Sequence, residues 1–159
     1  MAVRRERSRR GFTLIEFGVV LAIIATLAAM VSTAYLSYLE RVRVLRSVLE
    51  IKNIATALSG YLVEGETLPA TLADAGLGTP TDPWGNPYQY LPLAGGGGGG
   101  GGGPALARKD RFLVPINTDF DLYSMGQDGE SVPPLTAAKS RDDVVRAANG
   151  AYIGLASKF

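Results

Sequence analysis

Carboxylates are the side chains in this sequence whose type and spacing are compatible with catalysis or with cation binding. Asp128 lies in a Gly-x-Asp-Gly turn, and Asp142 and Asp143 form a pair further along the chain. The 159 residues include no histidine and no cysteine. Disulfides and catalytic triads built on those residues are therefore excluded, and zinc, iron and copper sites are disfavoured. What remains is a carboxylate hydrolase, for which the sequence shows no pocket signature, or oxygen ligation of a hard cation such as calcium.

The same three aspartates also have ordinary structural interpretations. Asp128 and the glycine after it form a typical turn sequence. Asp142 and Asp143 would place negative charge at the N-terminus of a short helix over residues 142–148, capped by Ser140, where such charge is stabilising. Three carboxylates brought together would instead repel one another unless a cation neutralised them. The spacing is not that of an EF-hand, and the residues alone leave the turn-and-cap and metal-ligand interpretations open.

Glu16, a further carboxylate, stands at the start of an apolar segment. Residues 17–39 contain no charged side chain, and a helix of that length can cross a bilayer core of about 30 Å. A charge placed in hydrocarbon costs on the order of 3 kcal/mol. Glu16 therefore either lies at the level of the lipid headgroups or needs a cationic partner within a membrane or a filament.

A basic flank precedes the apolar segment, and an amphipathic stretch follows it. Residues 1–11 hold five arginines and one glutamate, a pattern typical of the cytoplasmic flank of a membrane helix. This flank is only weak evidence for nucleic-acid binding. Beyond residue 39, apolar side chains recur at helical spacing at Val42, Leu45, Leu49 and residues 55–58. We expect one long helix over residues 12–62, apolar all round in its first half and amphipathic in its second.

The rest of the chain has the pattern of a small α+β domain. The elements that we expect are a helical turn at Thr71–Ala75 and short strands near Tyr88–Leu91, over Phe112–Ile116 and over Phe120–Tyr123. The glycine run 95–103 cannot pack a core and lacks the Lys-Ser/Thr of a phosphate-binding loop, so we interpret it as a flexible loop. The expected architecture is one long helix packed against a small antiparallel sheet, with a C-terminal loop region.

Three motifs resemble those of a known family. Residues 10–16 (RGFTLIE) follow the basic flank and resemble the signal of type IV pilins and type II secretion pseudopilins. Residues 82–88 (DPWGNPY) and 121–129 (DLYSMGQDG) resemble, more narrowly, the major G-type pseudopilin of type II secretion systems. The resemblance covers residues 9–90 and about 119–146. It implies a pilin-like fold and a structural filament subunit that is not an enzyme.

The resemblance assigns roles to residues near both ends of the chain. In that family a membrane peptidase cuts after the glycine, here Gly11, and methylates the new amino terminus, here Phe12. Glu16 would then pair with the Phe12 amine of a neighbouring subunit. Near the C-terminus the resemblance implies one Ca²⁺, held by the carboxylates of Asp128, Asp142 and Asp143 and by backbone carbonyls at about Met125 and Ser140.

Location and partners are also implied by the resemblance. Residues 1–11 would be a leader that is removed, residues 12–39 a transmembrane and assembly helix, and residues 40–159 a periplasmic domain. The protein would sit in the bacterial inner membrane as a single-pass subunit. It would then polymerise, with other pseudopilins and an inner-membrane assembly platform, into a periplasmic pseudopilus that drives protein export. A type IV pilin or minor pilin is the alternative, which the lack of cysteine and the two narrower motifs disfavour.

Overall fold

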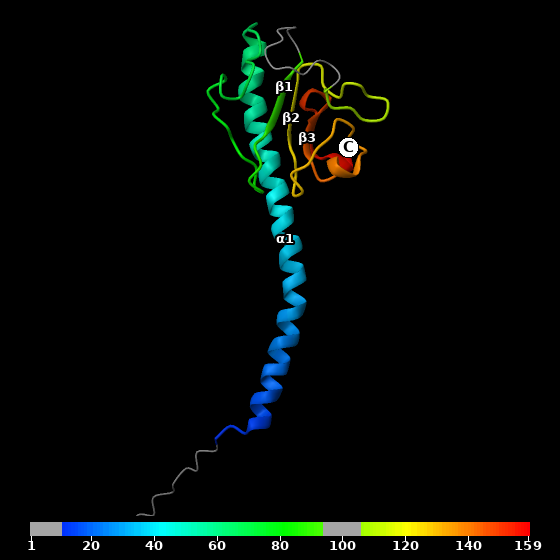
Figure 1. The fold of residues 1–159 in the computed structure, drawn as a ribbon. Helices are drawn as coiled ribbons and strands as arrows, with labels where there is room; N and C mark the ends of the chain where they lie inside the picture. Colours follow the sequence, from blue (N-terminus) through cyan, green and yellow to red (C-terminus); the bar gives the residue numbers. More distant parts are fainter. Residues whose placement is uncertain (1–10, 94–105) are drawn as a thin grey trace, which may run out of the picture. The chain divides into compact units, whose positions relative to one another are not determined.

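The structure, a computed structural model, describes residues 11–93 and 106–159 (Figure 1). Residues 1–10 of the predicted leader and the predicted glycine loop at 95–103 lie outside the described residues. The chain forms two compact units that divide after Glu40. The helix α1 (Leu14–Val63) contributes to both units.

The C-terminal end of α1 is fixed by glycine. Gly65 adopts φ +75°, a left-handed conformation that glycine enters without strain. The amide of Gly65 donates to the carbonyl of Leu62 at 3.3 Å, and the amide of Glu66 donates to that of Tyr61 at 2.9 Å. This pair of bonds is a Schellman motif, which satisfies the last carbonyls of a helix. The helix expected over residues 12–62 is therefore confirmed to within two residues at each end.

The second unit, residues 41–159, contains a four-stranded antiparallel sheet in the order β1-β2-β3-β4 (Figure 1). Its strands are β1 (Gln89–Pro92), β2 (Phe120–Ser124), β3 (Val144–Ala147) and β4 (Tyr152–Leu155). Short 3₁₀ helices lie at Ala138–Ser140, Ala148–Gly150 and Ala156–Lys158. The expected strands near residues 88–91 and 120–123 are confirmed as β1 and β2, and so is the α+β, pilin-like architecture.

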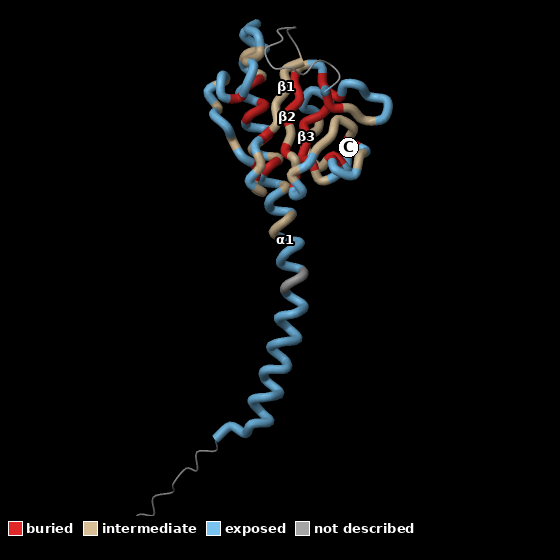
Figure 2. Tube along the Cα trace, viewed as in Figure 1, coloured by how far each residue is buried: buried red, intermediate tan, exposed pale blue. Residues whose placement is uncertain are grey.

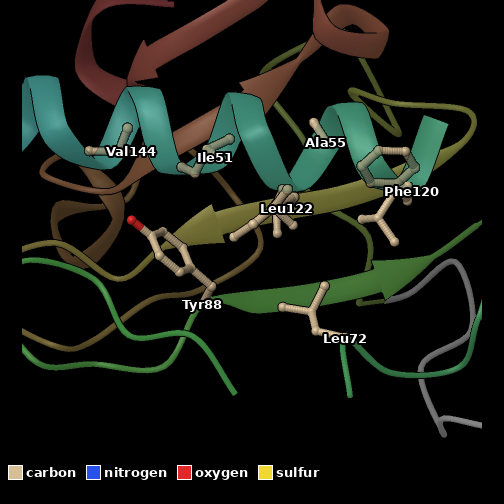
Figure 3. Close-up of a cluster of buried hydrophobic side chains, with 9 residues drawn as sticks. Ile51, Ala55, Leu72, Tyr88, Phe120, Leu122 and Val144 are labelled. Atoms are coloured by element: carbon tan, nitrogen blue, oxygen red, sulfur yellow. The ribbon is translucent and has the colours of Figure 1, made fainter. Parts of the chain in front are cut away.

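Both faces of this sheet are covered, and the buried segments of the unit gather there (Figure 2). One face packs against α1 through the apolar side chains of Ile51, Ile54, Ala55, Leu58, Phe120, Leu122 and Val144 (Figure 3). The other face packs against loops through Ile116, Leu135, Val145, Ala147 and Ala156. Because successive strand residues point to opposite faces, the core of this unit has two apolar layers, one on each side of the sheet.

The helix predicted over residues 142–148 is wrong, since its central residues form β3. Ser140 caps no helix there; its hydroxyl instead accepts from the amide of Val132 at 3.0 Å and donates to the carbonyl of Val132 at 2.8 Å. Val144 and Val145 are both fully buried, one on each face of the sheet. A strand covered on both faces reads as a continuous apolar run, which local periodicity cannot distinguish from a buried helical segment.

Two other short elements expected from the sequence have opposite outcomes. The helical turn at Thr71–Ala75 is confirmed by a hydrogen bond from the Ala75 amide to the Thr71 carbonyl at 3.3 Å. The strand expected over Phe112–Ile116 is wrong. Asp110 and Leu113 exchange backbone hydrogen bonds across a tight turn, and Phe112 at its tip is fully exposed. Only Ile116 anchors this segment in the core.

The amphipathic half of α1 buries a different face from the one that its pattern suggested. Residues 55 and 58 are buried as expected, but Val42, Leu45 and Leu49 are 42%, 63% and 62% exposed. The buried face runs instead through residues 47, 51 and 54. Since Val42, Leu45 and Leu49 are three and four residues apart, they share one side of the helix. We call these three residues the exposed stripe.

Candidate functional site

Glu16 caps the N-terminus of α1. Its Oε2 accepts hydrogen bonds from the backbone amide and from the hydroxyl of Thr13, each at 2.8 Å. The Thr13 hydroxyl oxygen in turn accepts from the Glu16 amide at 3.3 Å. This reciprocal capping box satisfies amides that have no partner inside the helix. Phe12 directly precedes Thr13, so the carboxylate is held one residue from the position where cleavage after Gly11 would create an amino terminus.

Most apolar side chains in the described part of the first unit, from residue 11 onward, are exposed. Phe12, Leu14 and Ile15 are 90%, 90% and 76% exposed. The helix α1 is long and apolar enough to cross a membrane, and none of its most apolar stretch is buried within the structure. Exposed apolar surface of this extent marks contact with a membrane or another protein. The first unit therefore fits the expected transmembrane and assembly segment.

In the second unit, the motifs at residues 82–88 and 121–129 lie against each other. The hydroxyl of Ser124 donates to Asp82 Oδ2 at 2.5 Å, and Asn86 Nδ2 donates to the carbonyl of Gly126 at 3.0 Å. Asp82 Oδ1 also accepts from the amide of Asn86 at 2.8 Å. The first motif is therefore the rigid turn that its proline, glycine and asparagine predict, and it supports the loop in which the calcium ligands were expected.

Asp142 and Asp128 are close together, but each already binds backbone amides. Asp142 Oδ2 accepts from the amides of Gln127 at 2.9 Å and Asp128 at 3.1 Å. Asp128 Oδ1 accepts from the amide of Glu130 at 2.8 Å. Gly126 has φ +64°, and a Cβ there would lie 2.6 Å from Asp142 Oδ2, so a close approach that only glycine permits brings the turn to Asp142.

The other predicted calcium ligands have different surroundings. Asp143 is buried and forms an ion pair with Arg108, while Ser140 is buried and Met125 is half-buried. Within residues 11–93 and 106–159, no group of three or more acidic side chains is gathered closely enough to hold a metal ion. The described geometry does not present the three aspartates as one ligand set, and calcium binding stays a prediction.

The sequence did not predict two ion pairs in this unit, one buried and one partly buried. The first joins Arg108 to Asp143, and the second joins Arg146 to Asp119 at 2.6 Å, with the Arg146 guanidinium 4.0 Å from the ring centroid of Phe120. Burial pushes the pKa of Asp119 upward, but hydrogen bonds from Arg146 and from a backbone amide outweigh burial and hold that pKa below its usual value. Because each pair joins residues far apart in the sequence, no local sequence pattern predicts it.

Comparison with known proteins agrees with this geometry. Residues 7–32 match the family described as the prokaryotic N-terminal methylation motif. Together with the apolar helix and the small antiparallel sheet, this match defines the chain as a pilin-like protein. Over 147 residues it is 33% identical to the "Type II secretion system core protein G" of Pseudomonas aeruginosa, a match that covers 79% of this chain and 89% of that protein. The chain therefore belongs to the core protein G family, the G-type pseudopilins of type II secretion.

Further relatives separate the pseudopilin from the pilin alternative. The core protein G of Vibrio cholerae is 31% identical over 56% of this chain and 75% of its own length. A "Fimbrial protein" of Pseudomonas aeruginosa is 39% identical, but only over 39% of this chain and 40% of that protein. The fimbrial match thus supports the shared pilin-like class more than a fimbrial role. No solved structure matches the chain significantly. These relatives are structural pilin and pseudopilin proteins rather than enzymes.

Proposed function

We propose that this chain is a subunit that polymerises into a periplasmic pseudopilus and thereby drives protein export by type II secretion. The observation that carries the proposal is the similarity to core protein G across 89% of that relative's length. In this proposal a prepilin peptidase cuts after Gly11 and methylates Phe12, and residues 12–39 anchor the subunit in the inner membrane. Residues 40–159 lie in the periplasm, where an assembly platform adds the subunit to a filament with other pseudopilins.

Two features of the described chain support a filament of identical subunits. The apolar stretch of α1 in the first unit is unburied within the structure, and the second unit adds the exposed stripe on its part of α1. Neighbouring copies can cover both surfaces at once. The Glu16 carboxylate and the Phe12 amine of an adjacent copy would neutralise each other in such an apolar core, which is the condition for burying either charge.

Processing of the N-terminus is the first expected result. Mass spectrometry of the mature protein isolated from membranes should find a chain that begins at N-methylated Phe12, because residues 7–32 match the methylation motif. The matched control is a strain without the prepilin peptidase, in which the chain should keep its arginines at residues 4–10. A mature protein that retains those arginines in the presence of the peptidase would contradict the proposal and leave an uncleaved signal anchor.

Secretion distinguishes the pseudopilus from a surface pilus. In a strain that lacks the gene, type II substrates should accumulate in the periplasm. The wild-type gene on a plasmid should restore their export. Electron microscopy of cells that overproduce the system should then show either no surface fibres or only bundled pseudopili. Long surface fibres together with unchanged secretion in the deletion strain would favour the pilin alternative.

A further inference from the structure

Loops that cover the second face of the sheet converge on one buried cation, the guanidinium of Arg108. Arg108 is 2% exposed and its ion-pair partner Asp143 is fully buried. Arg108 Nη1 also donates to the hydroxyl of Ser131 and, at 2.8 Å, to the carbonyl of Val132. Its Cζ lies 4.2 Å from the ring centroid of Tyr123, a cation–π contact. The Arg108 side chain therefore contacts three segments: the residue before β3, the loop at residues 131–132, and β2.

The backbone of Arg108 is fixed as well. Its amide donates to Asp121 Oδ2 at 2.6 Å, and its carbonyl accepts from the amide of Ile116 at 2.9 Å. Ser131 closes the arrangement, because its hydroxyl also donates to Asp143 Oδ2 at 2.6 Å. The residue is thus held at both ends, and its side chain cannot move aside without breaking buried hydrogen bonds.

We propose that Arg108 is the cation that holds the C-terminal segments of this domain together, and that the domain folds without calcium. The family resemblance assigns this work to Ca²⁺ on Asp128, Asp142 and Asp143. In this chain the guanidinium of Arg108 neutralises Asp143, while Asp142 and Asp128 accept backbone amides. A loop region without disulfides needs some other interaction to hold its segments together, which we call the clip. A buried arginine with several hydrogen bonds to neighbouring segments supplies it.

Asp143 Oδ1 is where a metal ion would compete with this arrangement. Among the described residues, Oδ1 is buried and has no hydrogen-bond partner. An ion bound there would share Asp143 with the guanidinium of Arg108, in surroundings where water screens little. Two positive charges in such a site repel strongly. Calcium and the Arg108 ion pair are therefore alternatives for Asp143, and an experiment can distinguish them.

Thermal unfolding of the full-length mature protein in detergent micelles tests the proposal without any substitution. Fluorescence of Trp84 is the readout, because it is the chain's single tryptophan and packs against the core of the second unit. We expect the midpoint in millimolar calcium and in a chelator to agree within about 1 °C, since an ion that bound only the folded form would raise it by mass action. A higher midpoint with calcium, lost in Asp128→Ala, would overturn the proposal.

Variants at Arg108 test the ion pair itself. Arg108→Met should lower the midpoint by about 10 °C or more, because it leaves the charge of Asp143 buried without a cationic partner and with only the Ser131 hydroxyl bonded to it. Calcium should not restore the midpoint. The matched control is Lys139→Met, which removes an exposed ion pair with Glu130 in the same loop region. That control should shift the midpoint by less than about 2 °C, as exposed pairs contribute little.

A double variant keeps the test decisive if Arg108→Met fails to fold. Arg108→Met with Asp143→Leu removes both charges and fills their places with apolar side chains. The double variant should therefore recover more than half of the decrease in unfolding midpoint that Arg108→Met causes. Additive loss in the double variant, or rescue of Arg108→Met by calcium to the wild-type midpoint, would contradict the assignment of the clip to Arg108.

Discussion

Replacing Glu16 with leucine should abolish filament assembly or slow it at least tenfold, and should leave membrane insertion intact. Insertion is favoured because the segment that begins at residue 17 gains one more apolar residue. Assembly fails because the Phe12 ammonium of a neighbouring subunit would enter an apolar filament core without its partner, which costs several kcal/mol. Sheared or crosslinked filaments measure assembly, and membrane fractionation measures insertion.

Loss of the capping box is a second possible reason for an assembly defect in Glu16→Leu. Two matched variants distinguish it from loss of the charge. Glu16→Gln keeps a side-chain oxygen for the Thr13 amide but removes the charge. Thr13→Ala keeps the charge but removes the hydroxyl, at about 1 kcal/mol of helix stability. If pairing with Phe12 matters, Glu16→Gln should fail to assemble and Thr13→Ala should assemble. Normal filaments from Glu16→Gln would reduce Glu16 to a helix cap and contradict the pairing.

The first half of the chain could be predicted because its signals are local. The basic flank, the uncharged stretch over residues 17–39 and Gly65, two residues after Val63, lie within a few residues of what they specify. The sequence analysis nevertheless missed the bond between Thr13 and Glu16, although Thr-x-x-Glu is a recognisable capping pattern.

The second unit could be predicted only in part, because its deciding contacts join distant residues. The two motifs at residues 82–88 and 121–129 were each identified, but their mutual hydrogen bonds were not predicted. The assignment of Asp143 to calcium stays a prediction, and the ion pair of Asp143 with Arg108 was not predicted. Lys109 and Arg111 stand close to Arg108 in the sequence. Burial alone distinguishes these basic residues, and burial depends on the whole fold.

The exposed stripe on α1 also could not be predicted from the sequence, because distant residues decide which side of the helix is buried. Apolar residues on two sides of α1 give two candidate core faces, and the sheet covers only the one through Ile51 and Leu58. Leu45 and Leu49 stay 63% and 62% exposed. Fully burying a leucine contributes roughly 1.5–3 kcal/mol, and only the exposed part of each side chain remains to be buried. A neighbouring subunit that covers both would therefore gain about 2–4 kcal/mol, enough to change assembly at least about thirtyfold.

Combining Leu45→Asp with Leu49→Asp should therefore prevent filament formation while the domain stays folded. Each substitution at so exposed a site should change the free energy of unfolding by less than about 0.5 kcal/mol, so the Trp84 midpoint should hardly move. Ala57→Asp is the matched control, because residue 57 is also exposed but lies eight residues beyond Leu49, more than two helical turns past the stripe; it should assemble. If the double variant polymerises like the wild type, neighbouring subunits leave the stripe uncovered, and the stripe does not hold the filament together. If Ala57→Asp fails equally, added charge and not the stripe is responsible.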